Sequence, residues 1–490
     1  MRRVRPGPNR QHDGQLVLQH SNCRTTALAA GSADALVEWT RAKRHKPRVF
    51  ALAGVMSILI CTVAATASAQ QLKLTPFRPS DIYDVGEKAG WTVSAAEGTD
   101  APVASYSYTI KKNNLETIKS GSFDLSTSTA SIDVMIDEPA MLMLEIIPLA
   151  DSRADATPAA ATKGGRNRIV AGAAVAPTKL QPVAPRPADF DSFWEAKIKE
   201  LKEIPENAVL TPGESGVLDV DYATIQMDHI GGKHVYGQLA KPSDYTGKLP
   251  ALVIFQWASP PYPLQKSWVT SHAANGWLTL NIEPHDVLPT EPQSYYNALP
   301  REIKNYQSIG NNDREKSYFV QMYLADYRAV DYMAGRPDWD GKTLVVMGTS
   351  MGGQQSLCVA GLHPKVTHLV VNEPAGCDTN GPLHGRQSGY PNFPSNNPKI
   401  METALYVDAV NFSPHIKAKS LVAMGFVDTI APPVGIWTAF NQIGGSKEAV
   451  PMIDSPHNNL ATPAQQRPYT QRSAEWLSAL VKGQDVAAKE

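Results

Sequence analysis

The chain has no excess of charge of either sign. Its 490 residues include 46 lysines and arginines against 47 aspartates and glutamates, which leaves a formal net charge of −1. Proteins that bind nucleic acid or anionic membrane surfaces through charge usually carry a clear positive surplus. We therefore expect no nucleic-acid partner, and the hydrophobic content of 42% indicates a globular protein with a sizeable core.

Cysteine is scarce as well. Two of the four cysteines, Cys23 and Cys61, precede the predicted mature chain, so that Cys358 and Cys377 remain. Two cysteines are too few for a disulfide framework, and Cys358 is expected to be a small buried apolar residue. No group of histidines, cysteines and acids has metal-ligand spacing in the sequence. We therefore expect neither a metal nor another cofactor.

The chain also lacks an N-terminal apolar run long enough to span a membrane. Residues 49–63 are mostly apolar, whereas a spanning helix needs about 20 such residues. A basic region at 41–48 precedes them, and Ala67-Ser68-Ala69 has the form of a cleavage site. These features predict a signal peptide cleaved before Gln70, a secreted or periplasmic protein, and no stable membrane span after cleavage. A membrane anchor is the alternative interpretation, and residues 1–69 are set apart as an N-terminal extension and signal.

Composition divides the predicted mature chain into two domains and a linker. Residues 70–150 contain several short strand-like segments at close spacing, which predict a small all-β, immunoglobulin-like domain. Residues 151–187 are rich in alanine, proline, threonine and glycine and are expected to be a linker, although 168–172 could form a last β-strand. Strands and helices alternate over 188–483, which predicts an α/β domain with a mostly parallel sheet.

The motif with the clearest chemistry is Gly348-x-Ser350-x-Gly352, between an apolar strand and a helix-compatible segment. This is the pattern of a nucleophile elbow, in which a sharp turn presents the serine above the sheet and the following N–H points at an oxyanion. Here that N–H belongs to Met351. Because glycine makes up about 7% of average sequence, the motif alone is weak. A glycine-rich turn whose serine only caps a helix is the alternative.

A nucleophilic serine needs a histidine as base and a carboxylate that orients the histidine. In α/β-hydrolases these partners follow the serine in the order acid, then histidine. Asp428 comes just after a predicted strand at 420–424, and His457 comes just after one at 449–453. Ligands bind at the carboxyl ends of such strands. The sequence therefore predicts Ser350, Asp428 and His457 as a catalytic triad.

Other candidates fit these roles less well. His415 precedes a strand and is expected at the wrong end of the sheet, whereas His363 and His368 flank the strand after the elbow and are expected at the surface. Asp454 lies only three residues before His457 and is interpreted as structural.

Further segments add a family resemblance. The stretch Gly425-Phe426-Val427-Asp428-Thr429-Ile430-Ala431-Pro432-Pro433 and the opening of the α/β domain at 187–194 are more specific than the elbow. Over about 187–481 the chain resembles the acetyl xylan esterase and cephalosporin-C deacetylase family, carbohydrate esterase family seven. The resemblance implies an α/β-hydrolase that removes acetyl groups from sugar hydroxyls, with the same triad. It also suggests a homo-oligomer.

The chain departs from this family near the predicted site. The family usually has glutamine where Met351 stands, although only the backbone N–H is needed there. The second oxyanion donor is expected from the loop at 256–262, where Trp257 or Ala258 can donate an N–H and the two following prolines cannot.

Three further residues are expected at the mouth of the site as substrate contacts. They are Tyr262, in the same loop, and Glu283 and His285, which stand where the family has Asp-x-Arg-Gly. These differences concern the acyl and sugar preference more than the type of reaction.

The sequence thus predicts a secreted serine esterase that removes acetyl groups from acetylated xylan or oligosaccharides through an acetyl-serine intermediate. A peptidase like prolyl oligopeptidase and an esterase of other small acyl esters are alternatives within enzymes. The peptidase normally follows a large β-propeller, and residues 70–150 are too short for one. A non-catalytic carbohydrate-binding protein is the alternative outside enzymes, and the intact triad argues against it.

Overall fold

The computed structural model describes residues 72–96, 105–125, 129–149 and 168–486. All of them belong to one compact unit, Ala67–Glu490. The predicted signal peptide and its cleavage site before Gln70 lie outside the described residues, as do residues 151–167 of the predicted linker. Within the described residues, no helix is long and apolar enough to cross a membrane.

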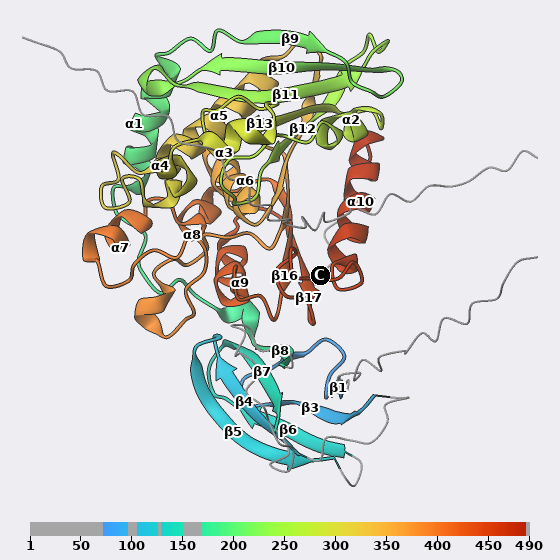
Figure 1. The fold of residues 1–490 in the computed structure, drawn as a ribbon, viewed down its shortest axis with the longest axis vertical. Coiled ribbons are helices and arrows are strands. Elements are labelled where there is room, and N and C mark those ends of the chain that lie inside the picture. Colours follow the sequence, from blue (N-terminus) through green and yellow to red (C-terminus); the bar gives the residue numbers. More distant parts are fainter. Residues whose placement is uncertain (1–71, 97–104, 126–128, 150–167, 487–490) are drawn as a thin grey trace, which may run out of the picture. The chain divides into compact units, whose positions relative to one another are not determined.

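A nine-stranded mixed sheet forms the centre of the larger part of the chain (Figure 1). Its strand order is β17-β16-β15-β14-β12-β13-β11-β10-β9. Strands β12 to β17 pair in parallel, and β9, β10 and β11 continue the sheet through antiparallel pairs. The strands are β9 (Val209–Gly213), β10 (Val220–Asp228), β11 (His234–Pro242), β12 (Leu249–Phe255), β13 (Leu278–Glu283), β14 (Trp339–Thr349), β15 (His368–Asn372), β16 (Lys419–Gly425) and β17 (Lys447–Met452).

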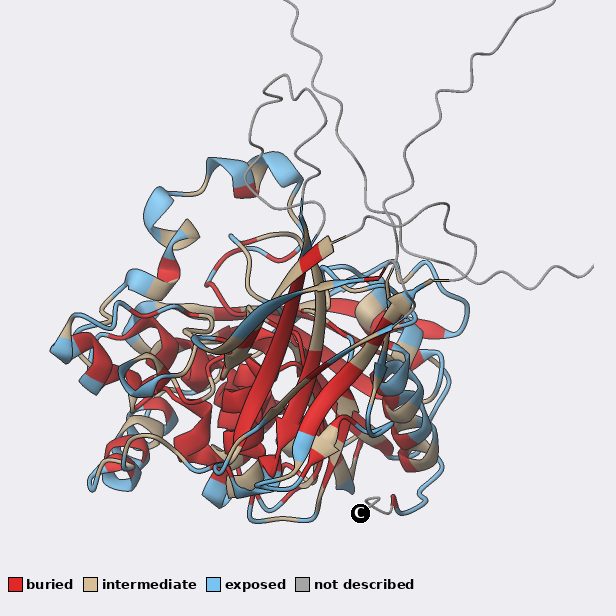
Figure 2. Ribbon diagram, turned by 90° about the horizontal axis from the view of Figure 1, so that it is seen from below, coloured by how far each residue is buried: buried red, intermediate tan, exposed pale blue. Residues whose placement is uncertain are grey.

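Helices cover both faces of this sheet, so its central strands have few polar positions. The helices are α1 (Phe190–Lys202), α2 (Ser267–Ala273), α3 (Gln293–Ala298), α4 (Arg301–Lys304), α5 (Tyr318–Gly335), α6 (Met351–Leu362), α7 (Pro398–Ala404), α8 (Ala409–Phe412), α9 (Pro433–Gln442) and α10 (Arg467–Val481). Helix α10 lies on one side of the sheet, and α6, α8 and α9 lie on the other (Figure 1). Buried residues are concentrated in the strands and the helices packed on them (Figure 2).

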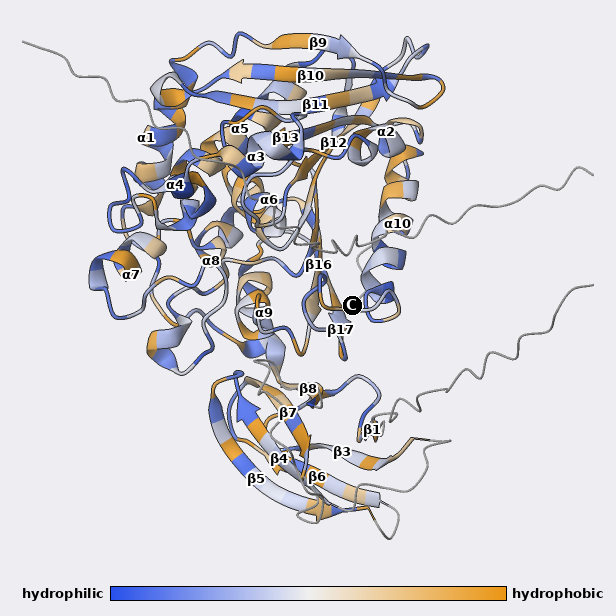
Figure 3. Ribbon diagram, viewed as in Figure 1, coloured by the Kyte–Doolittle hydropathy of each residue, from blue (hydrophilic) through white to orange (hydrophobic). Residues whose placement is uncertain are grey.

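Alternation along the strands divides the apolar residues between the two faces. Successive side chains of a strand point to opposite faces. Accordingly, Val253 and Val346 belong to the apolar cluster that contains α5 and α6, whereas Leu252 and Val345 pack in the cluster of α10. Helix α10 itself carries both hydrophobic and hydrophilic residues (Figure 3), and its Trp476 is buried against the sheet. The predicted α/β architecture is confirmed as a mixed sheet with helices.

Two smaller sheets precede the α/β part. Their orders are β1-β3-β6 and β2-β8-β7-β4-β5, and Trp91, Tyr106 and Leu144 lie in the apolar cluster that they share. The strands are β1 (Leu72–Pro76), β2 (Ile82–Tyr83), β3 (Lys88–Ala95), β4 (Ser105–Lys112), β5 (Glu116–Asp124), β6 (Thr129–Met135), β7 (Ala140–Pro148) and β8 (Ile169–Val175). Strand β8 falls within the segment expected to be a linker, and it pairs with β7.

These small sheets share buried residues with the α/β part. Met141 of β7 and Ala174 of β8 are fully buried in the same apolar cluster as Met424 of β16 and Trp437 of α9. At the turn between β4 and β5, the side-chain amide of Asn114 donates a hydrogen bond to the backbone carbonyl of Asp428, 3.1 Å away. The small sheets therefore contact the segment that carries the predicted catalytic acid.

Candidate active site

Ser350 lies in a sharp turn between β14 and α6. Its backbone has φ 58° and ψ −122°, in the left-handed region that few serines adopt. A Cβ on Gly348 would come within 2.3 Å of the Gly352 backbone, and a Cβ on Gly352 would come within 2.3 Å of the Phe255 carbonyl oxygen. Strand and helix therefore pass too close for side chains at both glycines, as the motif predicts.

The neighbouring strand fixes the serine through its backbone. Ser350 N donates to the carbonyl of Asn372, at the end of β15, and Ala375 N donates to the carbonyl of Ser350; both distances are 3.0 Å. The backbone N–H and carbonyl of Ser350 are thus both bonded to the end of β15 and the residues just after it.

The structure brings Ser350, His457 and Asp428 together from the ends of three strands. His457 Nε2 lies 2.9 Å from Ser350 Oγ, and His457 Nδ1 lies 2.6 Å from Asp428 Oδ2. Asp428 Oδ1 accepts hydrogen bonds from the backbone N–H groups of Ile430 and Ala431 at 2.7 and 2.8 Å. The loop after β16 therefore orients the carboxylate toward the imidazole.

Electrostatics favour the charged form of His457. Burial by itself lowers the pKa of an imidazole. At His457 this effect is outweighed by the hydrogen bond that the imidazole donates to Asp428, by the charge of Asp428 and by the charge of Glu373, so that the pKa lies above 6.5. Asp428 is fully buried and His457 is 4% exposed. Such a histidine can accept a proton from the serine and keep it while a reaction proceeds.

Ser350 and His457 open into a pocket of about 530 Å³, a volume typical of small-ligand sites. The pocket is lined by Trp257, Ala258, Ser259, Pro260, Lys304, Tyr306, Gln307, Ser350, Tyr390, Ile430, His457, Asn458 and Asn459. Trp257 is 39% exposed and packs on Tyr262, with ring centroids 5.7 Å apart. The wall of the pocket thus contains an open aromatic surface.

The predicted oxyanion donors adjoin this pocket. Met351 is the first residue of α6, where backbone N–H groups have no acceptor inside the helix. Trp257 and Ala258 line the same pocket as Ser350.

The side chain of Met351 is fully buried. Its sulfur lies 3.0 and 3.2 Å from the hydroxyls of Tyr306 and Tyr390, which are 2.6 Å from each other. The residue that departs from the family pattern therefore supports two tyrosines of the pocket wall.

The three residues expected as substrate contacts are not among the residues that line this pocket. Tyr262 packs on Trp257. Glu283 is 1% exposed and accepts a hydrogen bond from the Gln256 side chain at 3.1 Å, and its burial raises the pKa of the carboxyl well above the ordinary value. His285 is 2% exposed, and burial lowers its pKa to about 3. Glu283 and His285 are thus buried and are not among the residues that line the pocket at Ser350.

Of the histidines set aside, His363 was expected at the surface, and this prediction is wrong. His363 is 3% exposed, and its Nε2 lies 3.3 Å from Asp331 of α5. The burial follows from packing on Tyr327, with ring centroids 4.5 Å apart.

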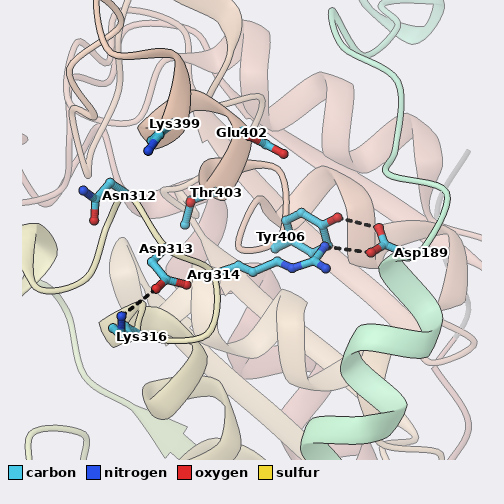
Figure 4. Close-up of a pocket in the computed structure, with 9 residues that line it drawn as sticks. All are labelled: Asp189, Asn312, Asp313, Arg314, Lys316, Lys399, Glu402, Thr403 and Tyr406. Atoms are coloured by element: carbon cyan, nitrogen blue, oxygen red, sulfur yellow. Dashed lines mark hydrogen bonds and ion pairs between the residues drawn. The ribbon is translucent and has the colours of Figure 1, made fainter.

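A second hollow, of about 760 Å³, shares no lining residue with the pocket at Ser350 (Figure 4). Its charged side chains largely pair with one another: Arg314 with Asp189 at 2.7 Å, and Lys316 with Asp313 at 2.9 Å. Tyr406 also donates a hydrogen bond to Asp189. This hollow has no serine or histidine among its lining residues, so the smaller pocket at Ser350 is the candidate active site.

In the described ranges, one group of side chains has donor atoms close enough to hold a metal ion. It consists of Glu373, Asp428 and His457, whose ligand atoms lie within 4.8 Å of one another. The donors are already occupied within the protein, since His457 bonds Asp428 and Glu373 accepts from the backbone N–H of Asn458. Sequence reasoning missed Glu373, although it directly follows β15 at the same sheet edge as Ser350.

A strand–turn–helix elbow, with an acid and a histidine after later strands of the same sheet, defines the α/β-hydrolase class. The sequence model of the acetyl xylan esterase (AXE1) family matches residues 178–479. The chain belongs to this family, and it is therefore a carboxylic ester hydrolase of the α/β-hydrolase type.

Individual relatives agree with this assignment. Over 410 residues the chain is 28% identical to the acetyl esterase Axe7A of Xylanibacter ruminicola, covering 82% of this chain and 88% of that protein. Two acetyl xylan esterase structures share its fold. That from Paenibacillus sp. R4 has a TM-score of 0.53 and 22% identity, covering 62% of this chain and 98% of its own. That from Thermoanaerobacterium sp. JW/SL YS485 has a TM-score of 0.51 and 19% identity, covering 62% and 97%.

Proposed function

We propose that the protein removes acetyl groups from sugar hydroxyls of acetylated xylan or its oligosaccharides, with Ser350, Asp428 and His457 as catalytic triad. The observation that carries this proposal is His457, which lies within hydrogen-bond distance of both the Ser350 hydroxyl and the Asp428 carboxylate. Acetyl is proposed as the acyl group because the chain belongs to the acetyl xylan esterase family and has the acetyl esterase Axe7A as a relative.

The proposed reaction uses both of these hydrogen bonds. His457 Nε2 takes the proton of Ser350 as its Oγ attacks the ester carbonyl, and a tetrahedral oxyanion forms. The backbone N–H of Met351 and one from Trp257 or Ala258 stabilise the oxyanion, and each such donor contributes about 10²–10³ in rate. His457 then gives its proton to the sugar oxygen as the ester bond breaks, which leaves an acetyl-serine. Water, deprotonated by His457, hydrolyses this intermediate and regenerates the serine.

The aromatic surface beside the serine supports a sugar as the alcohol part of the substrate. Trp257 stacks on Tyr262 and meets Trp268 edge-on, with ring centroids 4.8 Å apart. This packing holds the half-exposed indole in place at the pocket wall. A rigid apolar ring with polar groups beside it, such as Asn458 and Asn459, suits the mixed polar and apolar faces of a xylose ring.

We further propose that the protein acts outside the cytoplasm, after cleavage of the N-terminal signal before Gln70, and that the strands from β1 to β8 constitute an immunoglobulin-like domain. The two sheets with a common core support the sandwich architecture. We also propose a homo-oligomer, and only the resemblance to the family supports this proposal.

Acetate release tests the function directly. The purified protein is given acetylated xylan, 4-nitrophenyl acetate and 4-nitrophenyl butyrate, and Ser350→Ala is compared with Ser271→Ala, an exposed serine on α2. We expect acetate from all acetylated substrates, and loss of about 10⁴-fold or more in kcat for Ser350→Ala only. Turnover of the nitrophenyl esters without xylan deacetylation would favour an esterase of other small acyl esters. Full activity of Ser350→Ala would refute the triad.

A further inference from the structure

Glu373 is a buried carboxylate beside the triad that the reaction described above does not use. It follows β15 directly, is fully buried, and has φ +46°. Its backbone N–H donates to the carbonyl of Ala423 in β16 at 2.9 Å. A left-handed conformation is unfavourable for a residue with a side chain, and such strain concentrates at functional sites. The conformation turns the carboxylate toward the loop of His457.

The carboxylate bonds both sides of the histidine loop. Glu373 Oε2 accepts a hydrogen bond from the backbone N–H of Asn458 at 2.6 Å, and Oε1 accepts one from Gln466 Nε2 at 2.8 Å. Gln466 also bonds Ser455 Oγ at 2.9 Å and Asn372 Nδ2 at 2.8 Å. These bonds connect the loop of His457 to the end of β15.

The same end of β15 holds the nucleophile. Asn372 accepts the backbone N–H of Ser350, and Ala375 donates to the Ser350 carbonyl. Glu373 stands between Asn372 and Ala375 in the chain. A single short segment therefore fixes serine and histidine relative to each other, which matters because their hydrogen bond must remain in place for proton transfer.

Glu373 also faces the imidazole as a second negative group. Its Oε2 lies 3.7 Å from His457 Nδ1, beside the closer carboxylate of Asp428 at 2.6 Å. The titratable groups that face Glu373 are Asp428 after β16, His457 after β17 and Tyr469 on α10. An opposite charge at this distance stabilises the protonated imidazole.

We propose that Glu373 is a positioning residue for this esterase: it fixes the His457 loop through Asn458 and stabilises the imidazolium that forms when Ser350 loses its proton. The inference rests on the proposed triad. Burial and the charge of Asp428 raise the pKa of Glu373 to about 7. The stabilising charge is therefore present above that pH and is lost as Glu373 takes up a proton below it.

The test is the pH profile of kcat/KM for 4-nitrophenyl acetate in wild type and Glu373→Gln, from about pH 5 to 9. Glutamine keeps the shape and an oxygen that can accept from Asn458, but it removes the charge and the acceptor of Gln466 Nε2. We expect kcat to fall about tenfold in Glu373→Gln at pH 8 with KM nearly unchanged. This deficit should shrink below pH 7, because wild-type Glu373 is then itself neutral. The acidic limb of the variant should therefore lie at lower pH.

The control variant is Glu195→Gln, an exposed glutamate of α1, which should match wild type at every pH. A deficit of Glu373→Gln that is equal at all pH values would mean a purely structural role, and unchanged activity would mean no role; either result overturns the proposal. Inactive wild type, or fully active Ser350→Ala, would instead refute the proposed function. If Glu373→Gln fails to fold, the acidic limb of the wild-type pH profile of kcat/KM is the deciding measurement. We expect this limb to contain two ionisations, and a limb that fits a single ionisation would overturn the inference.

Discussion

At the scale of single residues, Trp257 combines two tasks in the proposed site. Its backbone N–H is one of the two candidates for the second oxyanion donor, and its indole forms part of the pocket wall. The indole is 39% exposed although it is large and apolar. An exposed aromatic ring that is held by two others is a common feature of binding surfaces.

Trp257→Ala separates the two tasks, because the substitution removes the ring and keeps the backbone. We expect KM for acetylated xylo-oligosaccharides to rise about tenfold, equivalent to about 1.4 kcal/mol of lost binding, while kcat/KM for 4-nitrophenyl acetate changes less than about twofold. Steady-state kinetics with both substrates measures the difference. Tyr245→Ala, at an exposed tyrosine outside the pocket lining, is the control. An equal loss on both esters would contradict a sugar-binding role for the ring.

At the scale of elements, the crossing of β12, β14 and α6 sets the position of Ser350. Gly352 in α6 faces the carbonyl oxygen of Phe255 in β12, so that even a methyl group would lie 2.3 Å from it. Backbone on both sides leaves no flexible side chain that could move away. The position of α6, and with it the serine, depends on this absence of a side chain.

Gly352→Ala should therefore destabilise the fold and misplace the nucleophile. We expect unfolding free energy to fall by about 2–4 kcal/mol, as for overpacked cores and strained backbone, and kcat to fall with it. Chemical denaturation and 4-nitrophenyl acetate hydrolysis measure both effects. The matched control is Gly335→Ala at the end of α5, where nothing lies within 4 Å of the new methyl group. Equal stabilities of the two variants would contradict the close packing at the elbow.

Elements of the α/β region could be predicted from sequence because their strands are apolar runs with turns at both ends. The strand expected at 420–424 is β16, Lys419–Gly425. Strand β5 could not be predicted, since most of its residues are exposed and polar. The triad Ser350, Asp428 and His457 could be predicted because each residue comes just after an apolar strand. The role of Glu373 could not be predicted, because its side-chain direction depends on a left-handed turn that the sequence does not reveal. A polar residue directly after an apolar strand was the available signal.

At the scale of the whole molecule, the small sheets and the α/β part share a core. Met141 of β7 belongs to the same apolar cluster as Met424 of β16, and a Cβ on Gly172 of β8 would lie 2.5 Å from Phe426 Cβ. The acetyl xylan esterase structures from Paenibacillus and Thermoanaerobacterium match about three fifths of this chain but nearly all of their own length. The additional strands of this protein are therefore expected to contribute to the stability of the α/β part.

Met141→Ala is expected to lower the stability of the esterase although β7 is not part of the central sheet. Removing a fully buried methionine costs about 2–5 kcal/mol, and the shared cluster carries this loss to the α/β part. The midpoint of thermal inactivation, measured by residual activity on 4-nitrophenyl acetate, should therefore fall. Met135→Ala on β6, where the side chain is 60% exposed, should leave it unchanged within error. Identical midpoints would show that the small sheets unfold independently.

The turn at Ser350 has a consequence for how this chain can evolve. Its backbone angles suit glycine better than serine, and such strain lowers stability by about 1–3 kcal/mol. A population selected for heat resistance alone would gain by exchanging Ser350 for glycine and would lose the nucleophile in the same step. The elbow is thus a position at which selection for catalysis and selection for stability favour different amino acids.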